Sequence, residues 1–181
     1  AALLQQLLYN EQAGLLDLHL NQEQRVLESE AWMWSYEDFS AFGLYGKARE
    51  GQSLEAVEQL LLAELDRVRR GAIDDWLLEA VLNDLKLGYL ESSEQNAARV
   101  SAMTNMFVLG VDWARFVQRI DWMAQVSVEQ LARWARTHLR DDNYAVVYKR
   151  QGEPVDVVKV AKPPITPVEL KRGALSDYAR D

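Results

Sequence analysis

The chain has 181 residues, the size of one ordinary domain, and its 49% hydrophobic and 27% charged residues exclude an intrinsically disordered chain. It carries 20 lysine and arginine residues against 28 aspartate and glutamate residues, and the net charge of −8 argues against general binding to nucleic acid or anionic lipid. The absence of cysteine excludes disulfides, thiolate zinc sites and cysteine nucleophiles. The longest uncharged apolar stretch, near residues 100–111, is too short to cross a bilayer, so we expect no membrane span.

The first 50 residues predict two short helices followed by a β-hairpin. Four leucines at helical spacing open the chain: Leu3, Leu4, Leu7 and Leu8. Because this apolar stretch starts without a methionine, we expect the chain to be a piece of a longer polypeptide. Gly14 predicts a break before a second helix at 15–20. Residues 25–34 change to a period of two, and the aromatic, glycine-containing run at 39–47 completes the predicted hairpin.

Five consecutive helices are predicted in the middle of the chain. Their expected positions are 53–70, 74–90, 95–109, 112–123 and 127–139. Ser53 provides an N-cap for the first and Gly71 a C-cap, while Ser127 and Gln130 have the spacing of a capping box. On the fourth of these helices we expect an inward face made of Trp113, Phe116, Val117 and Ile120.

The C-terminal part predicts one more strand and then an extended segment. Residues 143–150 alternate in the manner of a strand, and all four prolines fall between Pro154 and Pro167. We therefore predict a folded body at 1–150 and a strap or interdomain linker at 151–181. Because strands and helices are segregated along the chain, the sequence favours an α+β fold, with an antiparallel sheet of about three or more strands covered on one face by five to seven helices.

Motifs that carry catalysis or bind metal are not found. The two histidines, His19 and His138, are 119 residues apart, whereas zinc-binding histidines on a helix stand three or four residues apart. We interpret both as structural or surface residues. Glu28 and Glu30 share a strand face and resemble a catalytic carboxylate pair, although such a pair is more often part of a solvated face. We therefore predict no catalytic, cofactor-binding or metal-binding residue in this chain.

Five of the six tryptophans fall into two groups. Three lie in predicted helices near apolar positions, where we expect core packing: Trp76, Trp113 and Trp134. Trp32 and Trp34 instead share a strand face with Glu28 and Glu30. If the helices leave that face uncovered, these four residues form a surface for a peptide or a partner protein.

Several stretches between residues 14 and 167 have a distinctive order. The stretches are Gly14-Leu15-Leu16 ahead of the hairpin, Gly51-Gln52-Ser53-Leu54-Glu55 before the long helix, Phe107, Gly110, Asp112, Trp113 and Ile120-Asp121 at helix connections, the run 143–150 followed by Gly152, and the run 162–167. In this order they resemble the second, non-catalytic half of a homologous pair in the pitrilysin/insulinase-like zinc metallopeptidases.

The resemblance implies a two-layer half-domain that packs against a catalytic half-domain of the same polypeptide and helps to enclose a peptide substrate. The family's His-x-x-Glu-His motif is absent, so no catalytic or zinc-binding residue is carried over, and zinc is expected in the catalytic half of a zinc-dependent metalloendopeptidase. Related bacterial enzymes are often exported, which implies the cell envelope or periplasm.

Two other functions compete with this interpretation. One is a stand-alone protein-interaction module that uses the aromatic hairpin around Trp32 and Trp34. The other, an independent enzyme, lacks any supporting motif. With only three predicted strands we also expect an open sheet edge, which favours a homo-oligomer of the isolated chain.

Overall fold

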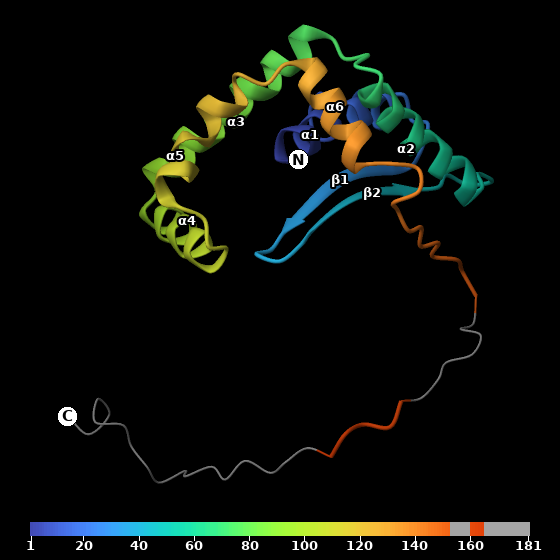
Figure 1. Cartoon of the computed structure of the whole chain (residues 1–181). Helices are drawn as coiled ribbons and strands as arrows, with labels where there is room; N and C mark the ends of the chain where they lie inside the picture. The colour runs from blue at the N-terminus through green and yellow to red at the C-terminus, as the bar shows by residue number, and fades with distance from the viewer. Residues whose placement is uncertain (153–159, 165–181) are drawn as a thin grey trace. The chain divides into compact units, whose positions relative to one another are not determined.

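The chain contains helices before and after a single hairpin, as seen in a computed structural model that describes residues 1–152 and 160–164. Two units are present, Ala1–Val147 and Tyr148–Asp181. The elements of the first unit are α1 (Ala2–Leu8), the short π-helix η1 (Asp17–Gln22), β1 (Glu28–Ser35), β2 (Ser40–Lys47), α2 (Leu54–Arg69), α3 (Asp75–Glu94), α4 (Asn96–Val108), α5 (Trp113–Met123) and α6 (Val128–His138) (Figure 1). This order confirms the α+β fold class.

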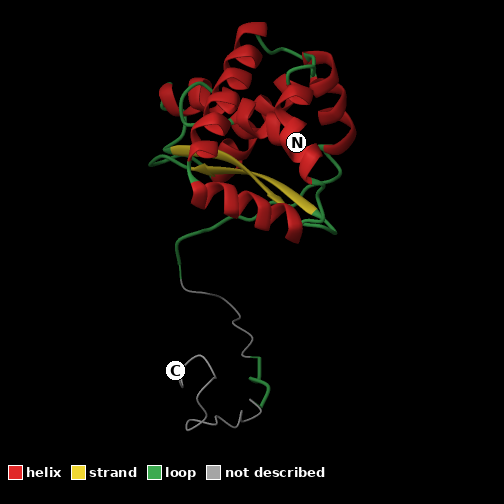
Figure 2. Cartoon of the chain, turned by 90° about the vertical axis from the view of Figure 1, so that its left-hand side faces the viewer, coloured by secondary structure: helices red, strands yellow, loops and turns green. Residues whose placement is uncertain are grey.

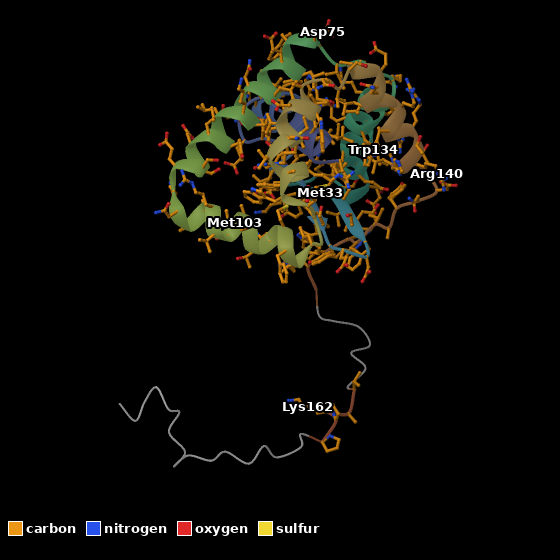
Figure 3. The ribbon with its side chains drawn as sticks, turned by 60° about the vertical axis from the view of Figure 1, so that its left-hand side comes forward. Met33, Asp75, Met103, Trp134, Arg140 and Lys162 are labelled. Carbon is orange, nitrogen blue, oxygen red and sulfur yellow. The ribbon has the colours of Figure 1, made fainter. Side chains whose placement is uncertain are left out.

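The core lies where α1, η1, α2, α6 and the first half of α3 meet the hairpin. The four leucines of α1 are all buried, as the helical spacing predicts. They belong to one apolar cluster with the stripe of α2 and with residues from α3 and α6. The buried members from these three helices include Val57, Leu61, Leu65, Val68, Leu77, Val81, Leu131 and Ala135. Figure 3 shows side chains crowded between these elements and sparser around Met103 on α4.

The hairpin is antiparallel and helices cover one of its faces. Residues Ser29 and Ala31 on that face are buried, and Ser29 lies opposite Gly46. A Cβ placed on Gly46 would be 2.5 Å from Cγ1 of Val57, so α2 packs directly on the backbone of β2. Figure 2 shows most of the helices above the two strands in that view, with one further helix along their lower side.

The burial alternation shifts by one residue just before β1. Val26 is buried and Leu27 is exposed, whereas the sequence pattern predicts that Leu27 faces the helices with Ala31 and Met33. The N–H of Leu27 donates to the carbonyl of Lys47, although Lys47 pairs with Glu28 in the strand register. Leu27 and Glu28 therefore both oppose Lys47, as in a β-bulge. Because of this extra residue, Val26 points to the buried side and Leu27 to the exposed side.

The helix ends confirm the predicted capping residues. The Ser53 side chain accepts a hydrogen bond from the N–H of Ala56, and Ser127 and Gln130 form both bonds of the capping box. After α2, Gly71 has a φ of +69°, and its N–H donates to the carbonyl of Val68. Local polar residues thus set these boundaries.

The third predicted strand is not formed. Residues 143–150 contain no helix or strand, and the sheet in the described part of the chain consists of β1 and β2 alone. In the second unit, residues 148–152 and 160–164 likewise have no regular structure, and the rest of the predicted linker lies outside the described residues. No helix among the described residues is long and apolar enough to cross a membrane.

Helices α3, α4 and α5 form an arm that contacts the core through the first half of α3 and through Met123 at the end of α5. Neither α4 nor α5 has a fully buried residue. On the face predicted to point inward, Phe116 and Ile120 are half-buried, whereas Trp113 and Val117 are exposed, so the prediction is wrong for these two. Trp76 and Trp113 are exposed, which corrects their assignment to the core, while Trp134 packs partly buried against it. The amphipathic α5 packs chiefly against α3 and α4, and its last residue, Met123, reaches the core.

Candidate functional site

The four candidate residues lie together on the hairpin face that the helices leave uncovered. We call Glu28, Glu30, Trp32 and Trp34 the aromatic–acidic face. Alternate residues of a strand point to the same side, so the period-two pattern in the sequence was sufficient to group them. Their cross-strand partners on β2 are Lys47, Tyr45, Gly43 and Ala41, respectively.

The two indoles of this face are in contact but differ in exposure. Their ring centroids are 4.6 Å apart and the planes are tilted by 35°. Trp32 lies across Gly43, since a Cβ there would be 2.2 Å from the indole, and Trp32 is therefore half-buried. Trp34 is 57% exposed. Gly43 and Ala41 are partners that the sequence reasoning did not identify, although their small size opposite two tryptophans was the available signal.

The acidic end of the face adjoins Tyr9, which follows α1. Burial raises the pKa of the Tyr9 phenol, and the carboxylates of Glu30, Glu11, Asp17 and Glu28 raise it further. Negative charge from two separate segments therefore converges around one tyrosine. Such an arrangement favours basic or hydrogen-bond-donating groups in its vicinity.

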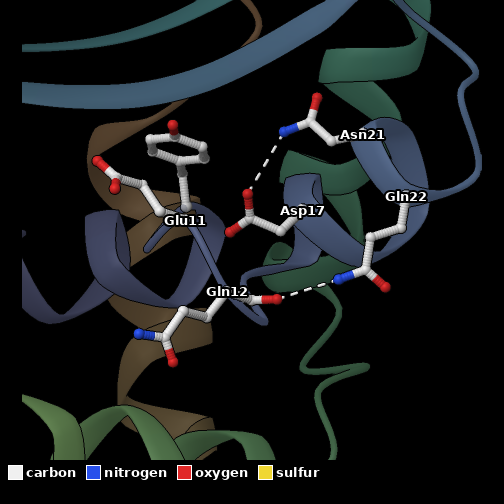
Figure 4. A pocket seen from close by; sticks show the side chains of 6 residues that line it. Glu11, Gln12, Asp17, Asn21 and Gln22 are labelled. Atoms are coloured by element: carbon white, nitrogen blue, oxygen red, sulfur yellow. Dashed lines mark hydrogen bonds between the residues drawn. The ribbon is translucent and has the colours of Figure 1, made fainter.

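An open hollow of about 500 Å³ lies beside Tyr9 (Figure 4). Its lining residues are Tyr9, Glu11, Gln12, Asp17, Asn21 and Gln22. Asp17 is buried, and its Oδ2 accepts the N–H groups of Asn10 and Gly14 at 3.1 Å each. Its Oδ1 accepts from the Asn21 side chain at 3.3 Å. This carboxylate holds the loop together, so it serves structure instead of proton transfer.

His19 is part of a second polar group on the other side of η1. Its Nδ1 lies 2.7 Å from Oε2 of Glu64, whose side chain is almost completely buried on α2. The Nε of Arg67 donates to the same oxygen at 3.1 Å. His19 therefore joins η1 to α2, in agreement with its interpretation as a structural residue.

His138 is remote from this group, on α6, where its ring contacts Trp134 at a centroid distance of 4.7 Å. Within residues 1–152 and 160–164, no three His, Asp or Glu side chains lie close enough to hold a metal ion together. The two histidines are on different elements and do not converge, so these residues do not fit the zinc that the sequence resemblance implies for a catalytic half.

A second aromatic group lies on the arm, away from the aromatic–acidic face. Trp113 stacks on Phe116 at 5.1 Å, and Phe116 meets Tyr89 edge to face at 6.4 Å. The Arg119 guanidinium lies 3.7 Å from the Phe116 ring centroid, and burial lowers the pKa of Arg119. These contacts join α3 to α5 and account for the arm's internal order.

Comparison with known proteins supports a fold and no finer assignment. No family model and no curated protein match this sequence. Among solved structures, the crystal structure of a protease from Helicobacter pylori is similar over 77% of this chain, with a TM-score of 0.72 and 18% sequence identity. The chain spans about a third of that protein's length, 34%. At this identity the similarity shows a shared, protease-like fold only.

Proposed function

We propose that this chain is a non-catalytic part of a zinc metallopeptidase and that its aromatic–acidic face forms one wall of the space that holds the peptide. The observation that carries the proposal is the protease-like fold over 77% of the chain. The ordered sequence resemblance to the pitrilysin/insulinase-like peptidases adds the family and the non-catalytic role. In the proposal, zinc and the water-activating glutamate come from a catalytic half of the same polypeptide.

The chemistry of the face supports a peptide as its ligand. Trp34 is exposed and contacts Trp32, so the pair offers a flat apolar surface. Glu28 and Glu30 provide negative charge on the same side of β1. A segment with lysine or arginine next to an apolar residue matches this combination, because cations interact both with carboxylates and with indole faces.

Binding of a labelled peptide tests the role of the face. We expect the chain to bind a fluorescein-labelled extended peptide that alternates arginine and leucine, measured by fluorescence anisotropy. Trp34→Ser should weaken binding about two- to fivefold, the loss expected for an exposed cation–π contact of about 0.5–1 kcal/mol. Trp76→Ser is the matched control, since Trp76 is exposed to a similar degree on α3. Equal losses in the two variants would contradict the proposal.

Peptide hydrolysis and zinc content test the non-catalytic assignment. The chain with added zinc should not cleave a quenched fluorescent peptide library, and dialysed protein should not retain zinc near one ion per chain. Hydrolysis that survives repurification, or stoichiometric zinc, would overturn this assignment without affecting the binding result.

A stand-alone interaction module remains the second candidate. It is favoured by the aromatic residues around the hairpin turn, where Tyr36 and Phe39 are exposed and in contact at 4.8 Å. That function requires a folded partner instead of an extended peptide. Tyr36→Ser with Phe39→Ser should then abolish partner binding and leave peptide binding unchanged.

A further inference from the structure

Side chains from α1 and η1 form hydrogen bonds with the backbone at the outer edge of β1, but only along part of its length. Asn21 of η1 accepts from the N–H and the hydroxyl of Ser29 at 2.8 Å and donates to the Ser29 carbonyl at 2.9 Å. Gln5 of α1 donates to the Ala31 carbonyl at 2.9 Å. These amides take the place of a neighbouring strand next to the first half of β1.

The second half of this edge has no such cover. Backbone groups of an antiparallel strand alternate between its two neighbours, and Ser29 uses its N–H and C=O on the outer side while Ala31 uses its C=O there. The N–H of Tyr36 bonds to Phe39 across the hairpin, which confirms that even-numbered residues face β2. The N–H and C=O groups of Met33 and Ser35 therefore point outward, and no described residue bonds to them. An edge of this kind accepts an added strand.

One described segment has the chemistry of the missing strand. Residues 144–147 have no helix or strand, and their backbone forms no hydrogen bond with the described residues. Tyr144, Val146 and Val147 are exposed, the last by 91%. β-Branched and aromatic residues favour β-strands. Exposed apolar side chains are also stabilised when an added strand removes them from water.

The present contact of the segment holds it at the end of its own hairpin away from the open part of the edge. The Tyr144 hydroxyl donates to Oε1 of Glu58 at 3.3 Å, and the adjacent Val57 packs on Gly46. Gly46 lies opposite Ser29, and Met33 is four residues, or about 13 Å, further along β1. A second molecule is not subject to this constraint.

We propose that the open β1 edge at Met33–Ser35 binds residues 144–147 of a second copy of this chain as an added strand. The exchange is reciprocal in a two-fold dimer, because each copy carries both the edge and the segment. This interface goes beyond the proposed function and uses the edge of the sheet, not the aromatic–acidic face. Loss of one activity therefore does not entail loss of the other.

The oligomeric state provides the first test. Light scattering after size exclusion should give twice the chain mass of 20.7 kDa at high concentration and the single mass on dilution. Val146→Pro with Val147→Pro should leave only the single mass. Consecutive N–H groups of a strand face opposite edges, so one of the two prolines removes a ladder donor in either orientation. Val160→Pro, at another exposed valine, should still dimerise.

Cross-linking between two variants provides the second test and does not depend on the prolines. Because the chain has no cysteine, Met33→Cys and Val146→Cys each introduce one thiol. Mixed together, they should yield a cross-linked heterodimer with a short bismaleimide, whereas Val146→Cys mixed with Ser101→Cys on exposed α4 should not.

Three results would overturn the proposal. They are a strict monomer at all concentrations, a dimer that persists in the double proline variant, and equal cross-linking of Met33→Cys and Ser101→Cys. A further informative result is a monomer that still binds a synthetic peptide of residues 143–150. That result would show that the β1 edge accepts a strand, and it would refute the proposal that a second copy of the chain supplies this strand.

Discussion

Glu64 carries a carboxylate that is almost completely buried, yet both of its partners reach solvent. The side chains of His19 and Arg67 are 27% and 42% exposed. The carboxylate therefore stays hydrogen-bonded without either partner having to be buried with it. This arrangement lets α2 and η1 approach closely at a polar contact, where an unpaired carboxylate would be costly.

Glu64→Gln should lower the free energy of unfolding by about 1–2 kcal/mol. The substitution removes the negative charge of the oxygen that His19 and Arg67 share, so both hydrogen bonds weaken, and a bond to a charged group is worth about 1 kcal/mol more than a neutral one. Urea denaturation at pH 7 measures the change. Glu79→Gln, at an exposed glutamate on α3, should change stability by less than about 0.5 kcal/mol. Similar effects of the two substitutions would show that the buried group contributes nothing specific.

The pKa of Tyr9 is a measure of the negative charge around the candidate site. This pKa is raised by burial and then by Glu30 and other carboxylates, so the folded chain favours the neutral phenol. The associated stability is complete below the ordinary tyrosine pKa of about 10 and is lost as pH rises through the raised pKa of Tyr9. Glu30→Gln should lower the pKa of Tyr9 but leave it above the ordinary value, because burial persists.

An NMR titration of labelled tyrosine rings measures this pKa, with Tyr9→Phe to assign the signal. Glu37→Gln at the hairpin turn is the control, because Glu37 does not contribute to the raised pKa of Tyr9. An unchanged Tyr9 titration in Glu30→Gln would place Glu30 too far away to act on the phenol.

The stability of the hairpin depends on close contacts with neighbouring helices and on contacts between its own two strands. A two-stranded hairpin is marginal in water on its own. Here α2 packs on Gly46, Trp32 lies across Gly43, and amides from α1 and η1 bond to one edge. The hairpin is therefore stabilised by tertiary contacts more than by its own ladder.

Gly46→Ala and Gly88→Ala should change stability in opposite directions. A Cβ at Gly46 overlaps Val57 and Leu61, and such overpacking costs about 1–3 kcal/mol. Gly88 lies within α3, and a Cβ placed there would have no neighbouring atom within 4 Å, so alanine should add about 1 kcal/mol through helix propensity. Thermal unfolding followed by circular dichroism compares the two. Stabilisation by both alanines would refute the close approach of α2 to β2.

At the scale of the first unit, burial is unevenly distributed. The helices α1, α2 and α6 contribute buried residues, whereas α4 and α5 contribute none. The arm nevertheless approaches the hairpin at one point, because a Cβ on Gly110 would be 3.6 Å from Oε1 of Glu37. This contact between two turns is polar and exposed, so it adds little stability.

Amide hydrogen exchange should therefore be slowest in α2 and fastest, among the helices after the hairpin, in α4 and α5. Helices with few buried contacts open locally at a lower free energy than the core does. Exchange measured by mass spectrometry on peptides covering 54–69 and 96–123 resolves the difference. Equal protection of both regions would mean that the arm is covered in solution by something other than the described residues.

Much of the local structure was predictable because short-range chemistry determines it. The spacing of Leu3 to Leu8 defined the buried face of α1, Ser53 and Ser127 set helix starts, and the period of two grouped Trp32 and Trp34 on one face. The pairing of Glu64 with His19 was not predictable, because 45 residues separate them and no local pattern links the two.

Residues close together in the chain were enough to predict the helices, the hairpin and the side of β1 that carries the candidate residues. They were also enough to show that a zinc-binding motif is absent from the sequence. Only the tertiary structure decided that residues 143–150 form no strand, that Trp76 and Trp113 are exposed and that Trp32 is half-buried over Gly43. A strand requires a partner edge, and burial of an amphipathic face requires a second layer. Both are properties of neighbours that a segment's own residues do not specify.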